Sequence, residues 1–247
     1  MKLIKLSLVA ALFTTAIYAG NEAPIISTDD FEASANVALT SDYVWRGSSL
    51  TNEDMAIQGG MDLEYKGIYV GVWASNIAQL EGETNNNTTT IETDIYAGYA
   101  GEIDKFSYDV GYCQYMYINL SKDYNFGEAY VGLGYDFDVV AIGAKYSFGI
   151  KTDKFQANKH DNVEVTASVP LPWELSFDMA YGMFENMNDY YYTSISRDFG
   201  KFNVNLAYTG RTSATYGHSY FGNPNRDGDY NGERTKDFFV ATLGASF

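Results

Sequence analysis

The sequence predicts an all-β fold, a transmembrane antiparallel up-and-down β-barrel with twelve strands. Stretches of about 9 to 12 residues alternate apolar and polar side chains, as barrel strands do when one face meets lipid and the other the lumen. Short and long connections alternate between these stretches. No segment after the first nineteen residues is apolar over the roughly 18 residues that a spanning helix needs.

Residues 1–19 have the order of a secretory signal, with two lysines, an apolar run that begins at Leu6, and the small residue Ala19 at the end. The apolar run is about a dozen residues long, which is too short to span a membrane as a helix. We therefore expect a signal peptide over 1–19, a short N-terminal lead over 20–33 and the barrel over 34–247.

Five segments show the alternation most clearly, and seven weaker segments complete the twelve strands. The clear segments are 55–65, 129–137, 163–169, 173–181 and 202–208. The weaker segments are 35–47, 67–77, 91–100, 105–117, 139–149, 190–199 and 236–247. Both faces of 67–77 are apolar, so its pattern does not tell which face points inward. A miscount by one pair of strands preserves the alternation of links, so ten and fourteen strands also fit.

The connections between these segments support the same count. The short links lie near 66–67, 101–104, 136–138, 170–172 and 198–201. The long links are 48–54, 78–90, 118–126, 150–160, 184–189 and 210–235. A barrel of twelve strands needs five short and six long links when both termini lie at the end with short turns. The last strand ends in Phe247, as in chains that the outer-membrane barrel-assembly machinery recognises, so that machinery is an expected partner.

Four stretches in the first half of the chain resemble a known family. They are Ser41-Asp42-Tyr43-Val44-Trp45-Arg46-Gly47, then Gln58-Gly59-Gly60, then the stretch from Gly67 to Asn76, and finally the stretch from Glu92 to Tyr99. This pattern resembles the TorF-like family of proteobacterial outer-membrane proteins, which are associated with porins and have long been of unknown function. The resemblance implies a barrel in the outer membrane of a Gram-negative bacterium, and it brings no catalytic or ligand residues.

Charge and cysteine content exclude several classes of partner and of stabilising bond. The formal net charge is −16, so nucleic acid is not an expected partner. The chain has a single cysteine, Cys113, which cannot form an internal disulfide and which we expect to be an inert side chain. Lipid and lipopolysaccharide are the expected surroundings of the barrel.

The polar face of the expected strands carries ten acidic residues and two basic ones. The acidic residues are Asp42, Asp62, Glu64, Glu92, Asp94, Asp109, Glu128, Glu164, Glu174 and Asp178, and the basic residues are Arg46 and Lys145. A low-dielectric wall with one sign of charge concentrates the opposite ion. If water fills the lumen, it should therefore prefer cations. The alternative is that hydrated and partly protonated carboxylates fill the interior without selecting ions.

The end of the first expected strand allows two interpretations of its charged residues. The alternation places Asp42 and Arg46 in the lumen near the outer rim, and Tyr43 and Trp45 toward lipid as part of an aromatic belt. Arg46 is then either a fixed charge that steers solutes or the partner of a carboxylate on a neighbouring strand. Asp42 is not that partner, because four residues along a strand span about 13 Å.

The longest loop contains a candidate calcium site. Asp227, Asp229 and Asn231 have the spacing of the first half of a calcium loop, but the position of its bidentate glutamate is taken by Phe238. The same residue types also form tight turns, so a plain turn is the alternative. No other cofactor is expected.

The sequence gives little support to an enzyme. The two histidines, His160 and His218, lie in separate long loops without a nucleophile motif nearby. The sequence therefore predicts a narrow passive pore for small hydrophilic solutes that favours cations. The alternative is a non-conducting barrel whose acidic loops contact divalent cations, lipopolysaccharide or a partner, because large inward tyrosines could close the lumen.

Overall fold

The structure of the chain is a computed structural model that describes most of the expected barrel. The described residues are 25–28, 30–78, 90–118, 125–150, 161–185, 189–212 and 236–247. The expected signal peptide lies outside them. In this part of the chain no helix is long and apolar enough to cross a membrane.

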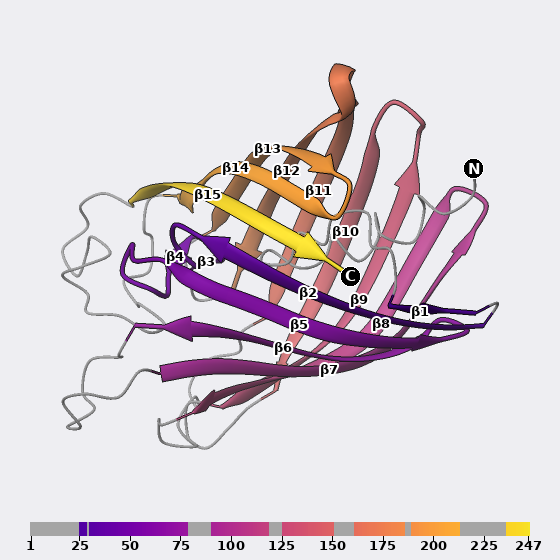
Figure 1. Cartoon of the computed structure of the whole chain (residues 1–247), viewed down its shortest axis with the longest axis horizontal. Helices are drawn as coiled ribbons and strands as arrows, with labels where there is room; N and C mark the ends of the chain where they lie inside the picture. Colours follow the sequence, from indigo (N-terminus) through magenta and orange to yellow (C-terminus); the bar gives the residue numbers. More distant parts are fainter. Residues whose placement is uncertain are drawn as a thin grey trace.

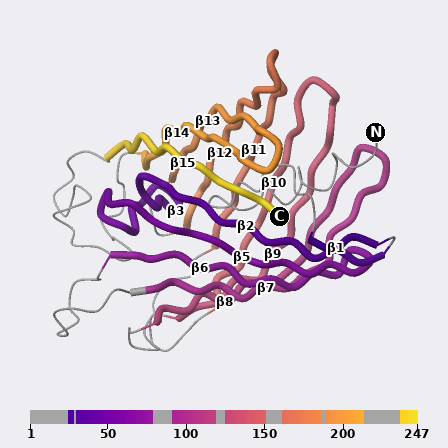
Figure 2. The backbone as a smooth tube through the Cα atoms, in the orientation of Figure 1, coloured from indigo at the N-terminus to yellow at the C-terminus, as the bar shows by residue number. Residues whose placement is uncertain are grey.

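Twelve long antiparallel strands form one closed barrel (Figures 1 and 2). The strands are β2 (Phe31–Thr40), β5 (Ala56–Tyr65), β6 (Ile68–Ile77), β7 (Thr90–Ile103), β8 (Phe106–Ile118), β9 (Phe126–Asp136), β10 (Ala141–Ile150), β11 (Asn162–Leu171), β12 (Leu175–Phe184), β13 (Tyr190–Phe199), β14 (Phe202–Arg211) and β15 (Asp237–Ser246). Each pairs with its neighbours in sequence, and β2 closes the barrel by pairing with both β5 and β15. Closure leaves these strands no long unpaired edge. The predicted fold class and strand number are confirmed.

Three very short strands accompany the barrel. β1 (Ile26–Ser27) pairs with the start of β2, while β3 (Val44–Trp45) and β4 (Ser48–Ser49) form a small separate hairpin. Strand β2 begins at Phe31, inside the expected N-terminal lead, so Glu32 belongs to the barrel wall.

The two ends of the barrel differ in their connections. Short turns at one end occupy residues 66–67, 104–105, 137–140, 172–174 and 200–201. Both chain ends of the barrel lie there, since Phe247 and Ala35 exchange backbone hydrogen bonds of 2.8 and 3.0 Å. The other six connections are longer in sequence, and they join strand ends at the opposite end of the barrel, which we call the long-loop end. This is the expected arrangement.

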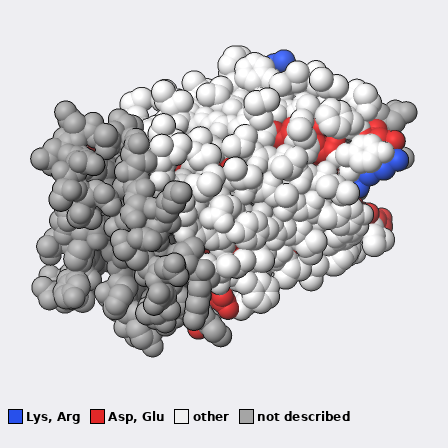
Figure 3. Space-filling view, turned by 90° about the horizontal axis from the view of Figure 1, so that it is seen from below, with Lys and Arg blue, Asp and Glu red and all other residues white. Residues whose placement is uncertain are grey.

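The outer face of the wall is apolar. Ile57, Met61 and Leu63 of β5 are exposed, whereas Gln58 and Asp62 between them point inward. The alternation also orients β6, which puts its valines outside and Tyr69 and Trp73 inside. The side seen in Figure 3 is almost free of charge over the wall, with charged residues gathered near its right-hand end. The barrel thus has an apolar outer face and a polar interior.

The first expected strand, 35–47, is wrong beyond Thr40. Strand β2 ends there, and residues 41–55, which we call the inward segment, fold into the barrel interior at the long-loop end. The physical reason is that the chain bends at Ser41 and then pairs with itself in the hairpin of β3 and β4 instead of with the wall. Arg46 and Gly47 form the turn of this hairpin, with φ values of 46° and 73°. A Cβ on Gly47 would lie 2.5 Å from the carbonyl oxygen of Gly210, so only glycine fits at this position.

Glycines on the inner wall make room for inward tyrosine rings. Tyr96 lies opposite Gly71 in the ladder of β6 and β7, and a Cβ on that glycine would be 2.4 Å from the ring. Tyr190 lies opposite Gly182 in the same way, with a ring atom 2.0 Å from the added Cβ. Large rings therefore occupy an interior that a twelve-strand wall would otherwise leave wider.

Candidate channel lumen

Most of the predicted lining residues face the barrel interior. They are Asp62 and Glu64 on β5, Glu92 and Asp94 on β7, Asp109 on β8, Glu128 on β9, Lys145 on β10, Glu164 on β11 and Asp178 on β12. Side chains of a β-strand point alternately to its two faces, and each of these residues is separated by an even number of positions from other inward residues of its strand. The carboxylates therefore come from β5, β7, β8, β9, β11 and β12, which together span much of the barrel wall.

Tyrosine hydroxyls hold several of these carboxylates in place. Tyr96 donates to Asp62 at 2.6 Å and Tyr69 donates to Asp109 at 2.7 Å, in each case from two strands away. Tyr69 also shares a hydrogen bond with Tyr130. A neutral donor satisfies a carboxylate without cancelling its charge, so these contacts fix the positions of negative charges inside the barrel.

Three carboxylates keep an oxygen without a hydrogen-bond partner among the described residues. They are Asp42 through Oδ2, Glu92 through Oε2 and Asp94 through Oδ1, and the last two lie two residues apart on β7. Glu92 is 1% exposed, and its Oε1 accepts a 3.2 Å hydrogen bond from Tyr43 of the inward segment. The unpartnered oxygens of Glu92 and Asp94 are therefore available as hydrogen-bond acceptors on this side of the lumen.

Cations of the inner wall are fewer. Lys145 lies opposite Glu164 in the ladder of β10 and β11, and its ammonium stands 5.6 Å from the ring centre of Tyr130. Arg211 closes β14 on the inner face and donates to the carbonyl oxygen of Arg46 at 3.3 Å. Neither Arg211 nor Glu32 was among the predicted lining residues, because Arg211 lies beyond residue 208, where the predicted strand ends, and Glu32 lies before residue 35, where the first predicted strand begins.

Glu174 does not line the lumen. Pro172–Glu174 form the short 3-10 turn η2 between β11 and β12, and the strand starts only at Leu175. The positive φ values of Trp173 and Glu174 take both residues out of the alternation that the prediction assumed. The side chain of Glu174 is 81% exposed and pairs with Arg197 at 3.3 Å. The expected lining role of Glu174 is therefore wrong.

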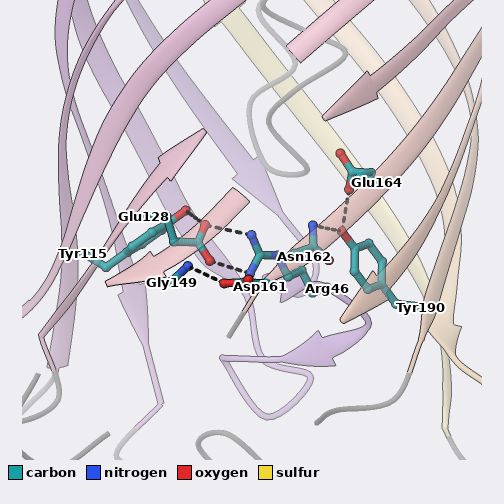
Figure 4. Close-up of polar contacts among 8 residues, drawn as sticks. All are labelled: Arg46, Tyr115, Glu128, Gly149, Asp161, Asn162, Glu164 and Tyr190. Atoms are coloured by element: carbon teal, nitrogen blue, oxygen red, sulfur yellow. Dashed lines mark hydrogen bonds and ion pairs between the residues drawn. The ribbon is translucent and has the colours of Figure 1, made fainter. Parts of the chain in front are cut away.

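Arg46 and Glu128 form a buried ion pair inside the barrel (Figure 4). Both terminal nitrogens of the guanidinium donate to the carboxylate, at 2.7 and 2.8 Å, and the two side chains are 5% and 3% exposed. The guanidinium carbon also lies 4.4 Å from the ring centre of Trp45 and 4.7 Å from that of Phe184. Such a bidentate geometry is the strong form of this contact. The predicted alternative of a carboxylate partner holds, but the partner comes from β9 instead of a strand adjacent to β2.

A second polar cluster, on β11 and β13, lies close to this ion pair. Figure 4 shows Tyr190 and Asn162 on the far side of Arg46 from Glu128. Tyr190 donates to Glu164 at 2.6 Å and accepts from Asn162 at 3.1 Å. Tyr115 reaches Glu128 at 3.4 Å. Polar side chains of β8, β9, β11 and β13 thus lie around the guanidinium (Figure 4).

Tyr43 and Trp45 do not belong to a lipid-facing aromatic belt, which corrects the expectation. They are 3% and 6% exposed and lie in a cluster of inward apolar side chains. The other members are Leu50, Ala56, Trp73, Ile77, Tyr117, Phe126 and Phe184, with Tyr96 and Tyr115 packed against them. Because the segment leaves the wall at Thr40, its aromatic side chains find the interior instead of lipid. The cluster fills part of the lumen at the long-loop end.

Asp42 holds the inward segment together. Its Oδ1 accepts hydrogen bonds from Ser49 at 2.7 Å and from Thr51 at 2.8 Å, and Thr51 accepts in turn from the backbone of Tyr43 at 2.9 Å. Burial raises the pKa of Asp42, while the two hydroxyl donors act in the opposite direction. As predicted, Asp42 is inside the barrel, where it stabilises the segment's own fold.

Two sets of candidate residues lie outside the described residues. They are the calcium candidates Asp227, Asp229 and Asn231, and the histidines His160 and His218. Among the residues that the structure does describe, no group of three or more metal-binding side chains comes together. Cys113 lies on the inner face of β8, directly opposite Glu128.

Several known structures with similar folds are porins. A KdgM porin superposes with a TM-score of 0.55 at 10% identity, over 87% of this chain and 99% of that one. A KdgM porin in complex with disordered oligogalacturonate gives the same values. A NanC porin superposes with a TM-score of 0.52 at 11% identity, over 86% of this chain and 98% of that one. At such identities the likeness shows the fold alone.

Sequence comparison places the chain in a family without an assigned function. No curated protein sequence matches it. None of the comparisons names the TorF-like family that the sequence resembles. The family described as "Bacterial protein of unknown function (Gcw_chp)" matches residues 26–247, and the chain belongs to that family.

Proposed function

We propose that this protein is an outer-membrane channel through which small hydrophilic solutes diffuse passively, with a preference for cations. The observation that carries the proposal is a closed barrel whose outer face is apolar and whose inner face is lined with carboxylates. Such a molecule satisfies its backbone internally and offers lipid a matching surface. The secretory signal expected in residues 1–19 supports export to that membrane.

The charges of the interior support the cation preference. Asp62, Asp94 and Asp109 lie on the inner wall with Lys145, and the buried Arg46 is paired with Glu128. The solute of one similar structure, an oligogalacturonate, is a polyanion. An acidic wall repels a polyanion, so we do not extend that solute to this chain.

A second candidate function follows from the inward segment. Its aromatic side chains and the Arg46–Glu128 pair occupy the lumen at the long-loop end. A barrel closed there would not conduct, and would act through its long acidic loops on divalent cations, lipopolysaccharide or a partner. The apolar cluster is the specific observation in favour of this candidate.

Recording from the folded protein in planar lipid bilayers separates the two candidates. A channel gives discrete current steps in potassium chloride, whereas detergent-only additions give none. The absence of steps from protein that keeps the electrophoretic mobility of a folded barrel would exclude the channel. Entry of small sugars into protein-containing liposomes, measured by swelling, then gives the size limit of the solutes.

A further inference from the structure

We propose that the inward segment, residues 41–55, is a gate of this channel and that the Arg46–Glu128 ion pair is the latch that holds it shut. The inference rests on the proposed channel function, because a gate needs a passage to close. It adds to that function the part of the chain that decides whether solutes pass.

The segment lies where it can block the passage. It leaves the wall at the end of β2, returns at the start of β5, and in between contacts strands on other sides of the barrel. Tyr43 packs against Trp73 of β6 with ring centres 5.3 Å apart. Trp45 contacts the rings of Phe126 on β9 and Phe184 on β12, at 6.3 and 6.0 Å. The segment therefore spans the interior from β6 to β12.

The segment is built to move as one unit. The backbone nitrogen of Leu50 donates to the carbonyl oxygen of Tyr43 at 2.7 Å, and the hairpin of β3 and β4 lies between them. Asp42 ties both sides together through Ser49 and Thr51. These contacts lie within the segment, so they persist when it leaves the interior.

The latch is the strongest contact between this unit and the far wall. Glu128 lies on β9, and the strands that hold the segment, β2 and β5, are far from β9 in the order of the barrel. The other polar contacts of the segment with strands that are not neighbours of β2 or β5 are single and longer, Tyr43 to Glu92 at 3.2 Å and Arg211 to the carbonyl of Arg46 at 3.3 Å. Next to its own strands the segment is also held by the backbone hydrogen bond from Ala78 to Leu50 at 2.7 Å and by the ion pair of Glu53 with Lys236. The bidentate pair is therefore the strongest polar contact with the far wall, and leaving either buried partner unpaired weakens docking.

Charge removal from either side of the latch should open the gate. In bilayers we expect Arg46→Met and Glu128→Gln to raise the open probability at least tenfold. The double variant should close again, because it leaves no unpaired buried charge. Lys105→Met is the matched control, since it removes a cation paired with Asp138 in an exposed turn at the other end of the barrel.

The native cysteine provides a second readout that does not depend on conductance. Cys113 lies opposite Glu128 on the inner wall, next to the carboxylate that binds Arg46 of the docked segment. We expect its labelling by a charged thiol reagent to accelerate at least tenfold in Arg46→Met. Loss of a nearby cation alone would slow this reaction by disfavouring the thiolate, so acceleration reports opening. Cys113→Ser is the labelling control.

The outcomes separate the gate from the channel. Equal open probability and equal Cys113 labelling in wild type and both single variants would overturn the gate and leave the channel standing. Accelerated labelling without currents from any variant would support the moving segment and overturn the channel. Single variants that fail to fold are replaced by Arg46→Lys, which keeps the charge, loses the bidentate contact and should open the gate to a smaller extent.

Discussion

Glu128→Gln is the perturbation whose size follows most directly from the structure. It leaves the Arg46 guanidinium in a site where its side chain is 5% exposed and where no second carboxylate from the described residues is bonded to it. Removing one partner of a buried ion pair costs about 3–5 kcal/mol, and burial at both ends means that solvent screening does not reduce this cost. At about 1.4 kcal/mol per factor of ten, docking of the inward segment weakens by about a hundredfold to a few thousandfold.

Tryptophan quenching measures this change in docking. The chain contains three tryptophans. Trp45 and Trp73 are buried in the cluster that the segment forms, whereas Trp173 is 79% exposed in the turn before β12. In a Trp173→Phe background, acrylamide should quench the fluorescence of Glu128→Gln strongly and that of the parent weakly.

A second variant makes the reasoning refutable. Arg46→Met with Glu128→Gln removes both charges and places an apolar chain between the rings of Trp45 and Phe184, so its quenching should stay near that of the parent. Equal protection of the parent and the Glu128→Gln single variant, both with folded barrels, would show that the ion pair does not hold the segment.

Three further predictions concern packing, pH and the surface. Gly182→Ala should lower the free energy of unfolding by about 1–3 kcal/mol in denaturant titrations, because the new methyl group displaces the Tyr190 ring; an unchanged midpoint would contradict the packing. Burial raises the pKa of Asp42 above its ordinary value of 3.8, so docking takes up a proton and weakens as pH rises through the raised pKa. Acrylamide quenching should therefore increase as pH rises through this pKa, and the increase should be absent in Asp42→Asn. Identical pH profiles of quenching in Asp42→Asn and its parent would show that Asp42 does not cause the pH dependence. Lys105→Met should leave the midpoint of denaturant unfolding unchanged, since its pair with Asp138 is exposed, and a clear shift of the midpoint would contradict this.

The wall of the barrel could be predicted from the sequence because its physics is local. Alternation with a period of two decides which face of a strand meets lipid, so residues such as Asp62 and Asp109 were placed inside from their neighbours alone. Strand ends were less certain. Pro172 begins a turn that takes Glu174 out of the wall, and Arg211 extends β14 beyond the last clear alternation.

The interior could not be predicted because its contacts are not local. Tyr43 and Trp45 continue the pattern of the first expected strand, but the wall strand ends at Thr40 and the chain then folds into the small hairpin of β3 and β4 in the lumen. Arg46 and Glu128 are 82 residues apart, on strands and segments that no sequence pattern relates. The glycines that make room for tyrosines could not be predicted either, since Gly71 makes room for a ring that comes from the next strand.

The reversal potential in a potassium chloride gradient tests the central claim most directly. The claim is that the carboxylates on the inner wall make this barrel a cation-preferring channel. Cations then cross faster than anions, and at zero current the dilute side becomes positive; neutralising Asp62 and Asp109 to asparagine should reduce this potential. A dilute side that becomes negative, or a potential unaffected by these substitutions, would contradict the account.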